Sequence, residues 1–181
     1  EELAKLAASD GEGADFFGGA VCVDGDTLLV GAESAGSSSS GAVYVLVENS
    51  ITGGWDEAAT LTPSDPSLME FGSSLALSVD TAVVGAPGPF TTMPGAAYVF
   101  ARNQGGAGAW GQVAELVPSD GSEFDAFGTA LSISGTTIVV GAPLDDHGDV
   151  GANAYGDGSV YVFELVQGVW TEVAWLVGSD A

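Results

Sequence analysis

The residues best suited to chemistry lie in one acidic loop, residues 145–157, with the sequence DDHGDVGANAYGD. Its carboxylate and amide side chains are those of Asp145, Asp146, Asp149, Asn153 and Asp157. Calcium takes about six to eight oxygen ligands, and the glycines of the loop would let the backbone fold around an ion. The loop therefore predicts a calcium site. Calcium is the one cofactor that the sequence suggests, and no organic cofactor is expected.

A second interpretation of this loop needs no ligand. Asp, Asn and Gly are common in exposed turns because their conformations and short polar side chains suit turns. The corresponding loops earlier in the chain, ESAGSSSSG and PGPFTTMPG, lack this group of aspartates, so a metal site would be confined to this loop. One histidine among carboxylates is weak support for transition-metal binding or catalysis, so His147 is expected to be an exposed turn residue.

Pairs of acidic residues five positions apart recur along the chain. The pairs are Asp10 and Asp15, Asp65 and Glu70, and Asp120 and Asp125. Because they recur together, they are expected to serve the repeating structure itself. Two roles fit: capping of turns by accepting backbone hydrogen bonds, and coordination of a cation between neighbouring units.

The charge balance excludes several classes of partner. The 181 residues include 25 Asp and Glu, but only Lys5 and Arg102 as basic residues, which gives a formal charge of −23. Phosphate binding depends on Lys and Arg, so no nucleic-acid partner is expected and an anionic membrane surface is disfavoured. No apolar run approaches the roughly 20 residues of a membrane-spanning helix, so direct membrane insertion is not expected. The acidity itself fits a solvated surface, a salty medium or divalent-cation binding.

No residue pattern indicates catalysis. No serine lies in a strand-to-helix nucleophile elbow, and carboxylate pairs are too abundant in so acidic a chain to mark an active site. Cys22, the single cysteine, lies in the apolar run AVCV and is expected to be a small buried side chain rather than a reactive thiol. The chain is therefore expected to be non-enzymatic.

The elements that must position these residues form a repeat. Phe-Gly pairs recur, with spacings of 54 and 56 residues, at Phe17, Phe71 and Phe127. Gly-Ala, Tyr-Val, Trp and Ser-Asp recur with about the same period. The predicted repeats are residues 11–65, 66–120 and 121–181, with residues 1–10 as the outer strand of a preceding unit. All form one repeat domain, which is expected to be a segment of a longer protein because the chain begins and ends at nearly the same phase.

Each repeat is predicted to contain four antiparallel β-strands. In the third copy, ALSIS and TIVVGA flank a tight turn at Ser134-Gly135-Thr136, and SVYVFELV and WTEVAWLV follow. Four strands at this period describe a blade of a β-propeller, either closed or open. The predicted fold class is therefore all-β, with glycines such as Gly31 and Gly85 allowing strands to crowd near the axis.

Aromatic residues offer a second candidate surface. Trp55, Trp110, Trp170 and three of the four tyrosines recur with the repeat, so they are predicted to pack within it. Trp175 and Tyr155 break this pattern. They are therefore the predicted partner contacts, in a surface that could stack on sugars.

The repeat units resemble FG-GAP repeats, the blades of integrin α-subunit propellers and of many secreted microbial and algal proteins. The likeness is carried by KLAASDGEGADFFGGAVCVDGDTLLVGA and ELVPSDGSEFDAFGTALSISGTTIVVGAP, and it is closer to the microbial and algal arrays. Integrin blades often place an Asp-X-Asp-X-Asp-Gly calcium loop between the Phe-Gly and Gly-Ala-Pro strands. Here Asp24-Gly25-Asp26 and its counterparts are predicted hairpin turns, too short for such a loop.

The resemblance implies an extracellular or cell-surface module that binds a protein or glycan partner in adhesion or surface assembly. Calcium bound by the loop at 145–157 would stiffen it. One alternative is a structural subunit of an extracellular filament, sheath or large complex, whose repeats self-associate edge to edge. Another is a binding appendage of a secreted hydrolase. Both remain open because a fold does not determine a function.

Overall fold

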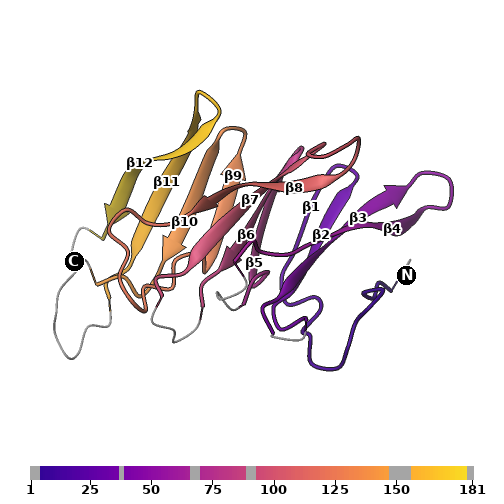
Figure 1. The fold of residues 1–181 in the computed structure, drawn as a ribbon, viewed down its shortest axis with the longest axis horizontal. Coiled ribbons are helices and arrows are strands. Elements are labelled where there is room, and N and C mark those ends of the chain that lie inside the picture. Colours follow the sequence, from indigo (N-terminus) through magenta and orange to yellow (C-terminus); the bar gives the residue numbers. More distant parts are fainter. Residues whose placement is uncertain (1–4, 37–38, 66–69, 89–92, 147–155, 179–181) are drawn as a thin grey trace.

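The computed structural model describes residues 5–36, 39–65, 70–88, 93–146 and 156–178. These residues form twelve β-strands and no helix. The strands make three four-stranded antiparallel sheets that stand side by side in chain order (Figure 1). The predicted all-β, propeller-like arrangement of four-stranded blades is confirmed. Within the described residues, no helix exists that could span a lipid bilayer.

Each sheet is one blade, in which neighbouring strands follow each other in the chain. Blade 1 consists of β1 (Val21–Asp24), β2 (Thr27–Ala32), β3 (Ala42–Asn49) and β4 (Gly54–Leu61). Blade 2 consists of β5 (Ser74–Ser78), β6 (Thr81–Ala86), β7 (Ala96–Arg102) and β8 (Trp110–Leu116). Blade 3 consists of β9 (Ala130–Ser134), β10 (Thr137–Ala142), β11 (Ser159–Val166) and β12 (Val169–Val177).

The first two strands of each blade are joined by a two-residue hairpin turn. In blade 1, Asp24 pairs with Thr27, so only Gly25 and Asp26 form the loop. The first loop residue has a positive φ in every blade: 59° at Gly25, 54° at Val79 and 58° at Gly135. Two-residue turns need this left-handed conformation to match the twist of the strands. The prediction that these turns are tight hairpins is therefore confirmed.

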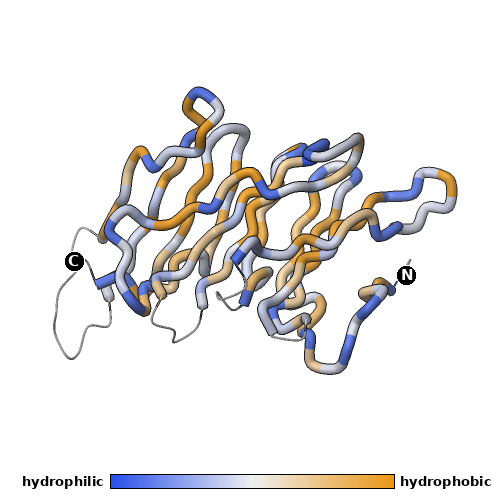
Figure 2. The backbone as a smooth tube through the Cα atoms, viewed as in Figure 1, coloured by the Kyte–Doolittle hydropathy of each residue, from blue (hydrophilic) through white to orange (hydrophobic). Residues whose placement is uncertain are grey.

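The hydrophobic core lies between the blades. One cluster joins Leu29 and Val43 of blade 1 to Val84 and Tyr98 of blade 2, all nearly inaccessible to solvent. A second cluster of the same kind joins blades 2 and 3. Hydrophobic residues follow the strands, whereas many hydrophilic residues gather in the connecting turns (Figure 2). Burial of side chains from both faces of the inner strands explains why these strands are continuously apolar.

Glycine allows the inner strands of neighbouring blades to approach closely. A Cβ atom on Gly31 would lie 2.0 Å from the carbonyl oxygen of Gly72, and one on Gly85 would lie 2.1 Å from that of Gly128. No side chain fits at such distances, so each position needs glycine. The predicted crowding of strands is confirmed at these two contacts.

Residues 5–10, the described part of the segment predicted to be an outer strand, form no strand. An outer strand needs the third strand of its own blade as a hydrogen-bonding partner, and no described strand pairs with this segment. Instead, the Ser9 hydroxyl donates to the Glu57 carboxylate on β4 at 3.0 Å. Ser119 contacts Glu172 on β12 in the same way, at 2.7 Å. The recurring Ser-Asp pair thus ties each lead-in segment to the outer strand of the blade that follows.

Candidate functional site

Three carboxylates converge at the loop end of blade 3. The side chains of Asp125, Asp145 and Asp146 each offer an oxygen, and these oxygens lie within 4.8 Å of one another. Asp125 and Asp145 are only 2% and 3% exposed. Carboxylates are rarely buried unless they are paired or coordinate a metal. This group, Asp125, Asp145 and Asp146, is called the acidic cluster below.

Local hydrogen bonds hold the acidic cluster in place. Asp145 lies in the turn after the Gly-Ala-Pro end of β10, where its amide donates to the Ala142 carbonyl at 3.3 Å. Asp125 lies in the segment that leads into β9, and its carboxylate accepts the Ser122 amide at 2.5 Å. The Leu144 amide also donates to the Asp125 carbonyl at 3.2 Å, which joins the two segments. Residues about 20 positions apart are thereby brought to one point.

Tyr161 on β11 links the acidic cluster to a fourth carboxylate. Its hydroxyl oxygen lies 2.7 Å from Asp145 Oδ2 and 2.8 Å from Asp120 Oδ1. A phenol has one proton, so it can donate fully to only one of these oxygens at a time. Burial, together with hydrogen bonds to Asp145 and Asp120, raises the pKa of Tyr161 above its usual range. The hydroxyl therefore stays protonated and acts as a donor to the carboxylates.

The cluster concentrates negative charge. Burial, followed by repulsion from Asp145, Asp146 and Asp120, raises the pKa of Asp125, although the Ser122 amide opposes this shift. Hard oxygen ligands of this kind suit calcium or magnesium. The three carboxylates could supply part of a coordination shell for a divalent cation, and such an ion would offset their mutual repulsion.

Two members of the predicted calcium loop, Asp145 and Asp146, belong to the cluster. Asp157 is exposed and is not one of its members. Asp149 and Asn153 lie outside the described residues, as do His147 and the predicted partner contact Tyr155. Sequence reasoning assigned Asp125 to the recurring acid pairs and not to the loop. One signal in the sequence could have linked Asp125 to the loop. Its acid pair, Asp120 and Asp125, lies in the same repeat as residues 145–157.

In blades 1 and 3 the acid pairs cap turns, as one of the two interpretations predicted. The second acid accepts the backbone amide three residues before it: Asp15 accepts from Glu12 at 2.6 Å, and Asp125 accepts from Ser122. The first acid of these two pairs accepts the tyrosine hydroxyl of the third strand, as Asp10 does from Tyr44 at 2.7 Å. At the position of Asp145, blade 1 has the buried Ala35. Blade 1 therefore lacks this carboxylate of the cluster.

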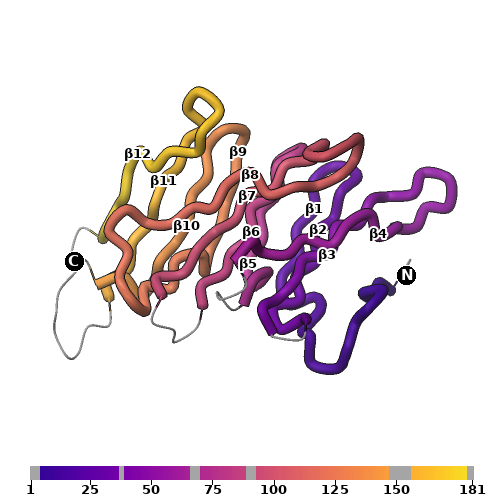
Figure 3. The backbone as a smooth tube through the Cα atoms, in the orientation of Figure 1, coloured from indigo at the N-terminus to yellow at the C-terminus, as the bar shows by residue number. Residues whose placement is uncertain are grey.

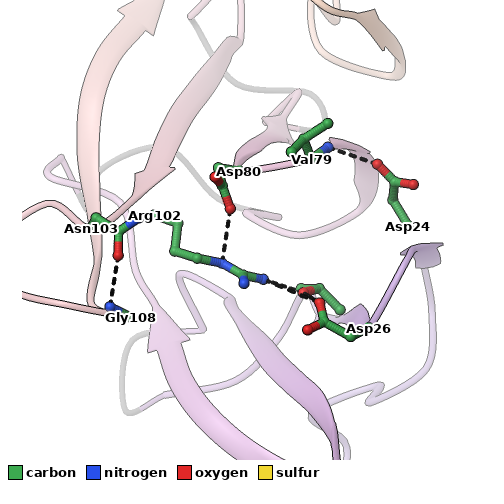
Figure 4. A network of polar contacts seen from close by, with 8 residues as sticks. Asp24, Asp26, Val79, Asp80, Arg102, Asn103 and Gly108 are labelled. Carbon is green, nitrogen blue, oxygen red and sulfur yellow. Dashed lines mark hydrogen bonds and ion pairs between the residues drawn. The ribbon is translucent and has the colours of Figure 1, made fainter.

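Arg102 makes a contact between blades that the sequence analysis did not predict. It lies on β7, and its Nε atom is 3.2 Å from Asp80 Oδ1, while Nη2 is 3.8 Å from Asp26 Oδ1 in the hairpin turn of blade 1 (Figure 4). The same side chain donates to the Thr27 hydroxyl. One of only two basic residues in the chain therefore joins blades 1 and 2. The rarity of basic residues in the sequence was the signal that could have drawn attention to Arg102.

Trp175, the other predicted partner contact, is 44% exposed on the outer strand β12. It is paired in register with Tyr161 on β11. Its neighbours Leu176 and Val173 are also exposed. By contrast, Trp55, Trp110 and Trp170 are half-buried and pack against the cores, as predicted for the recurring tryptophans. Trp175 thus belongs to an exposed apolar stretch at the outer edge of blade 3.

Comparisons with known proteins agree with this geometry. A solved structure described as a Europium-containing methanol dehydrogenase is similar, with a TM-score of 0.54 and 14% sequence identity. The similarity covers 92% of this chain but only 26% of the dehydrogenase chain, so this chain spans about a quarter of that protein. At this identity the likeness shows the fold alone. No curated protein sequence matches the chain.

The family comparison is more specific. A family model described as the FG-GAP repeat matches residues 1–46, 55–100 and 110–163. The second match runs from β4 into β7 and the third from β8 into β11, so each includes an outer strand and the inner strands of the next blade. FG-GAP repeats are typical of extracellular proteins. Since these three matches cover most of its length, the chain belongs to the FG-GAP repeat family.

Proposed function

We propose that this chain is a non-enzymatic, extracellular FG-GAP module that binds protein or glycan partners in adhesion or cell-surface assembly, with calcium stabilising its third blade. Membership of a family typical of extracellular proteins supports the location. The net charge of −23 supports a role on a solvated surface and disfavours polyanionic partners. The loops and outer strands would carry the recognition, because rigid blades position them.

The acidic cluster is the observation that carries the calcium proposal. Its three carboxylates meet in a nearly buried position, where uncompensated negative charge is costly. A calcium ion there would tie the segment before β9 to the turn after β10. Backbone carbonyls and waters would complete the six to eight ligands that calcium takes. The ion would act as a structural support for the binding loops.

Thermal unfolding in calcium and in a chelator tests this role. An ion that binds only the folded state adds about 1.4 kcal/mol to the free energy of unfolding when its free concentration is ten times its Kd. We expect calcium to raise the unfolding midpoint of the wild type and to have little effect on Asp146→Asn. Glu164→Gln is the matched control, because Glu164 is an exposed acid on β11 outside the cluster. An unchanged midpoint in the wild type would remove calcium from the proposal.

Partner binding is tested separately with panels of glycans and extracellular-matrix proteins. The exposed Trp175 supports a contact on β12, since aromatic side chains contribute strongly to binding surfaces. We expect Trp175→Ala to weaken any interaction found by at least about tenfold. Ile51→Ala, which changes a 93% exposed residue in the turn after β3, should leave the affinity for the same partner unchanged. Equal binding by Trp175→Ala and the wild type would exclude Trp175 as the contact.

A structural role in an extracellular assembly is the second candidate function. It is supported by the exposed apolar stretch at the outer edge of blade 3, which includes Val173 and Trp175 on β12. Electron microscopy of the concentrated protein distinguishes the two functions, because a structural subunit should form ordered rings or filaments without any added partner.

A further inference from the structure

Blades 1 and 2 hold an arginine side chain between them. Arg102 on β7 reaches the hairpin turn of blade 1, where its guanidinium lies against the Asp26 carboxylate (Figure 4) and donates to the Thr27 hydroxyl. The guanidinium carbon lies 5.3 Å from the centre of the Trp110 ring. A carboxylate, a hydroxyl and a tryptophan ring thus surround this cation. They are called the arginine site below, and in it Thr27 is only 1% exposed.

Blade 3 has Leu165 at the position of Arg102. The Arg102 amide donates to the carbonyl of Asp80, the second residue of its hairpin turn, at 2.9 Å. The Leu165 amide donates in the same way to Thr136 at 3.0 Å. Each residue also pairs in register with the first tryptophan of its outer strand. Leu165 is therefore the counterpart of Arg102, and it brings no cation to the contact between blades 2 and 3.

The other parts of the arginine site recur between blades 2 and 3, which stand side by side (Figure 3). Thr81 begins β6 as Thr27 begins β2, and Trp170 on β12 is the counterpart of Trp110 on β8. Thr81 is half-buried, whereas Thr27 is almost inaccessible. Glu115 on β8 adds a carboxylate to the same place. The hydroxyl, the ring and a carboxylate are thus present here without the arginine.

These groups line a groove of about 450 Å³ between the two blades. Val113 of blade 2, with Leu165 and Val169 of blade 3, adds apolar surface to it. These three side chains are 45%, 38% and 64% exposed, so the groove opens to solvent. Both of its walls come from described residues of adjacent blades. A further blade beyond β12 would pack on the opposite face of blade 3, so it would leave this groove open.

Charge favours a cation in this groove. The chain has a net charge of −23, and Glu115 is the one charged residue among those that line the groove. Arg102 is already paired with carboxylates between blades 1 and 2. Lys5 belongs to the N-terminal segment, which packs on blade 1 through Leu6. Neither basic residue of this sequence therefore fills the groove.

We infer that this groove binds an arginine side chain of a partner protein, with the guanidinium against Thr81, Glu115 and Trp170. The arginine site between blades 1 and 2 is the observation that identifies this occupant. A guanidinium is planar, donates several hydrogen bonds and stacks on aromatic rings. The apolar stem of the arginine would lie along Val113 and Leu165. The inference goes beyond the proposed contact on β12 and depends neither on that contact nor on calcium.

A nuclear magnetic resonance titration of the isotope-labelled protein with the tripeptide acetyl-Gly-Arg-Gly-amide is the experiment. We expect chemical-shift changes at the amides of Thr81, Gly168 and Val169 and at the indole of Trp170. The same tripeptide with citrulline, the uncharged analogue of arginine, should bind at least about tenfold more weakly. The lysine tripeptide should also bind more weakly, because an ammonium lacks the planar fork. Raising sodium chloride from about 0.05 M to about 0.5 M should weaken binding of the arginine tripeptide.

Leu165→Arg tests the groove from inside the molecule. It places in blade 3 the side chain that blade 2 has at this position, so an internal guanidinium should fill the groove and abolish binding of the arginine tripeptide. Val166→Arg is the matched control, because it adds the same charge at the neighbouring exposed residue, which does not line the groove. Glu115→Gln should weaken binding. Glu164→Gln, which changes an exposed acid outside the groove, should not.

Circular dichroism on each variant confirms that it is folded. The inference is overturned if the arginine tripeptide causes no shifts, or if the shifts spread over the acidic residues of all three blades, which would show non-specific charge attraction. Equal binding by the citrulline or lysine tripeptide, or undiminished binding by folded Leu165→Arg, would also overturn it. If Leu165→Arg does not fold, equal binding by Glu115→Gln and Glu164→Gln overturns it instead. None of these results depends on Trp175 or on calcium, so they are distinguishable from failure of the proposed function.

Discussion

Arg102 of blade 2 pairs with Asp26 of blade 1, with Nη2 of the guanidinium 3.8 Å from the carboxylate Oδ1. The arginine side chain is 21% exposed and the aspartate 63%, so solvent weakens this pair. The guanidinium also lies 5.3 Å from the centre of the Trp110 ring, in a cation–π contact. We expect Arg102→Ala to lower the free energy of unfolding by about 1–2 kcal/mol, measured by urea denaturation.

The matched control for Arg102 is Lys5→Ala. It removes the same charge from an exposed residue of the N-terminal segment. Its effect should be within about 0.5 kcal/mol of zero, because surface substitutions away from specific contacts are usually small. The Arg102 effect should also shrink in high salt. Equal losses in the two variants would show that only net charge matters and that the contact between blades does not.

The tyrosines of blades 2 and 3 predict different responses to loss of a hydroxyl. Tyr161→Phe leaves the buried Asp145 and its neighbour Asp120 without this donor, so it should cost about 1–3 kcal/mol. Tyr98 is fully buried, and its hydroxyl has no hydrogen-bond partner among the described residues. Tyr98→Phe should therefore be neutral or stabilising. The measurement is chemical denaturation of both variants, and a similar cost in each would contradict the assignment of the hydrogen bonds.

The fold could be predicted because its signals recur. A Phe-Gly pair or a Gly-Ala pair alone is weak, but three copies at one period establish the blade, its hairpin and its packed tryptophans. The strand predicted over residues 1–10 is not seen in residues 5–10. The sequence there matches that of the outer strands, but a strand forms only beside a hydrogen-bonded partner strand, and residues 5–10 have none among the described residues.

The candidate site was only partly predictable. Asp145 and Asp146 were visible as a run of carboxylates in one loop. Asp125 was not grouped with them, because its distance from that loop depends on the turn that follows β10. The role of Arg102 was hidden for the same reason, since its partners Asp26 and Thr27 lie about 75 residues earlier in the chain. Contacts between blades depend on how the sheets stack on one another. This stacking cannot be predicted from the sequence of a single repeat.

Glycine at the contacts between blades gives a prediction with an internal control. Gly85→Ala would place a methyl carbon 2.1 Å from the Gly128 carbonyl oxygen, so the backbone of one blade must move. We expect a loss of at least about 3 kcal/mol, at the upper end of the cost of overpacking. Gly141→Ala, at the same position of blade 3, should change the stability of the monomer by less than about 1 kcal/mol. Thermal unfolding of dilute protein measures both.

A similar loss in both glycine variants would contradict this account. It would mean that glycine is required at this position by the strand itself rather than by the neighbouring blade. The comparison therefore separates local backbone effects from contacts between blades.

The thiol of Cys22 should react slowly in the folded protein. Burial, followed by repulsion from Asp24, raises its pKa from 9.0 to about 11. Only the thiolate reacts, so at pH 8 the rate of alkylation by iodoacetamide should be about a hundredfold lower than in urea. The rate should rise about tenfold per pH unit towards pH 11. Asp24→Asn should increase the alkylation rate by less than unfolding does, because burial is the larger cause of the raised pKa. A rate at pH 8 equal to that of the unfolded chain would show that Cys22 is not protected by the contact between β1 and blade 2.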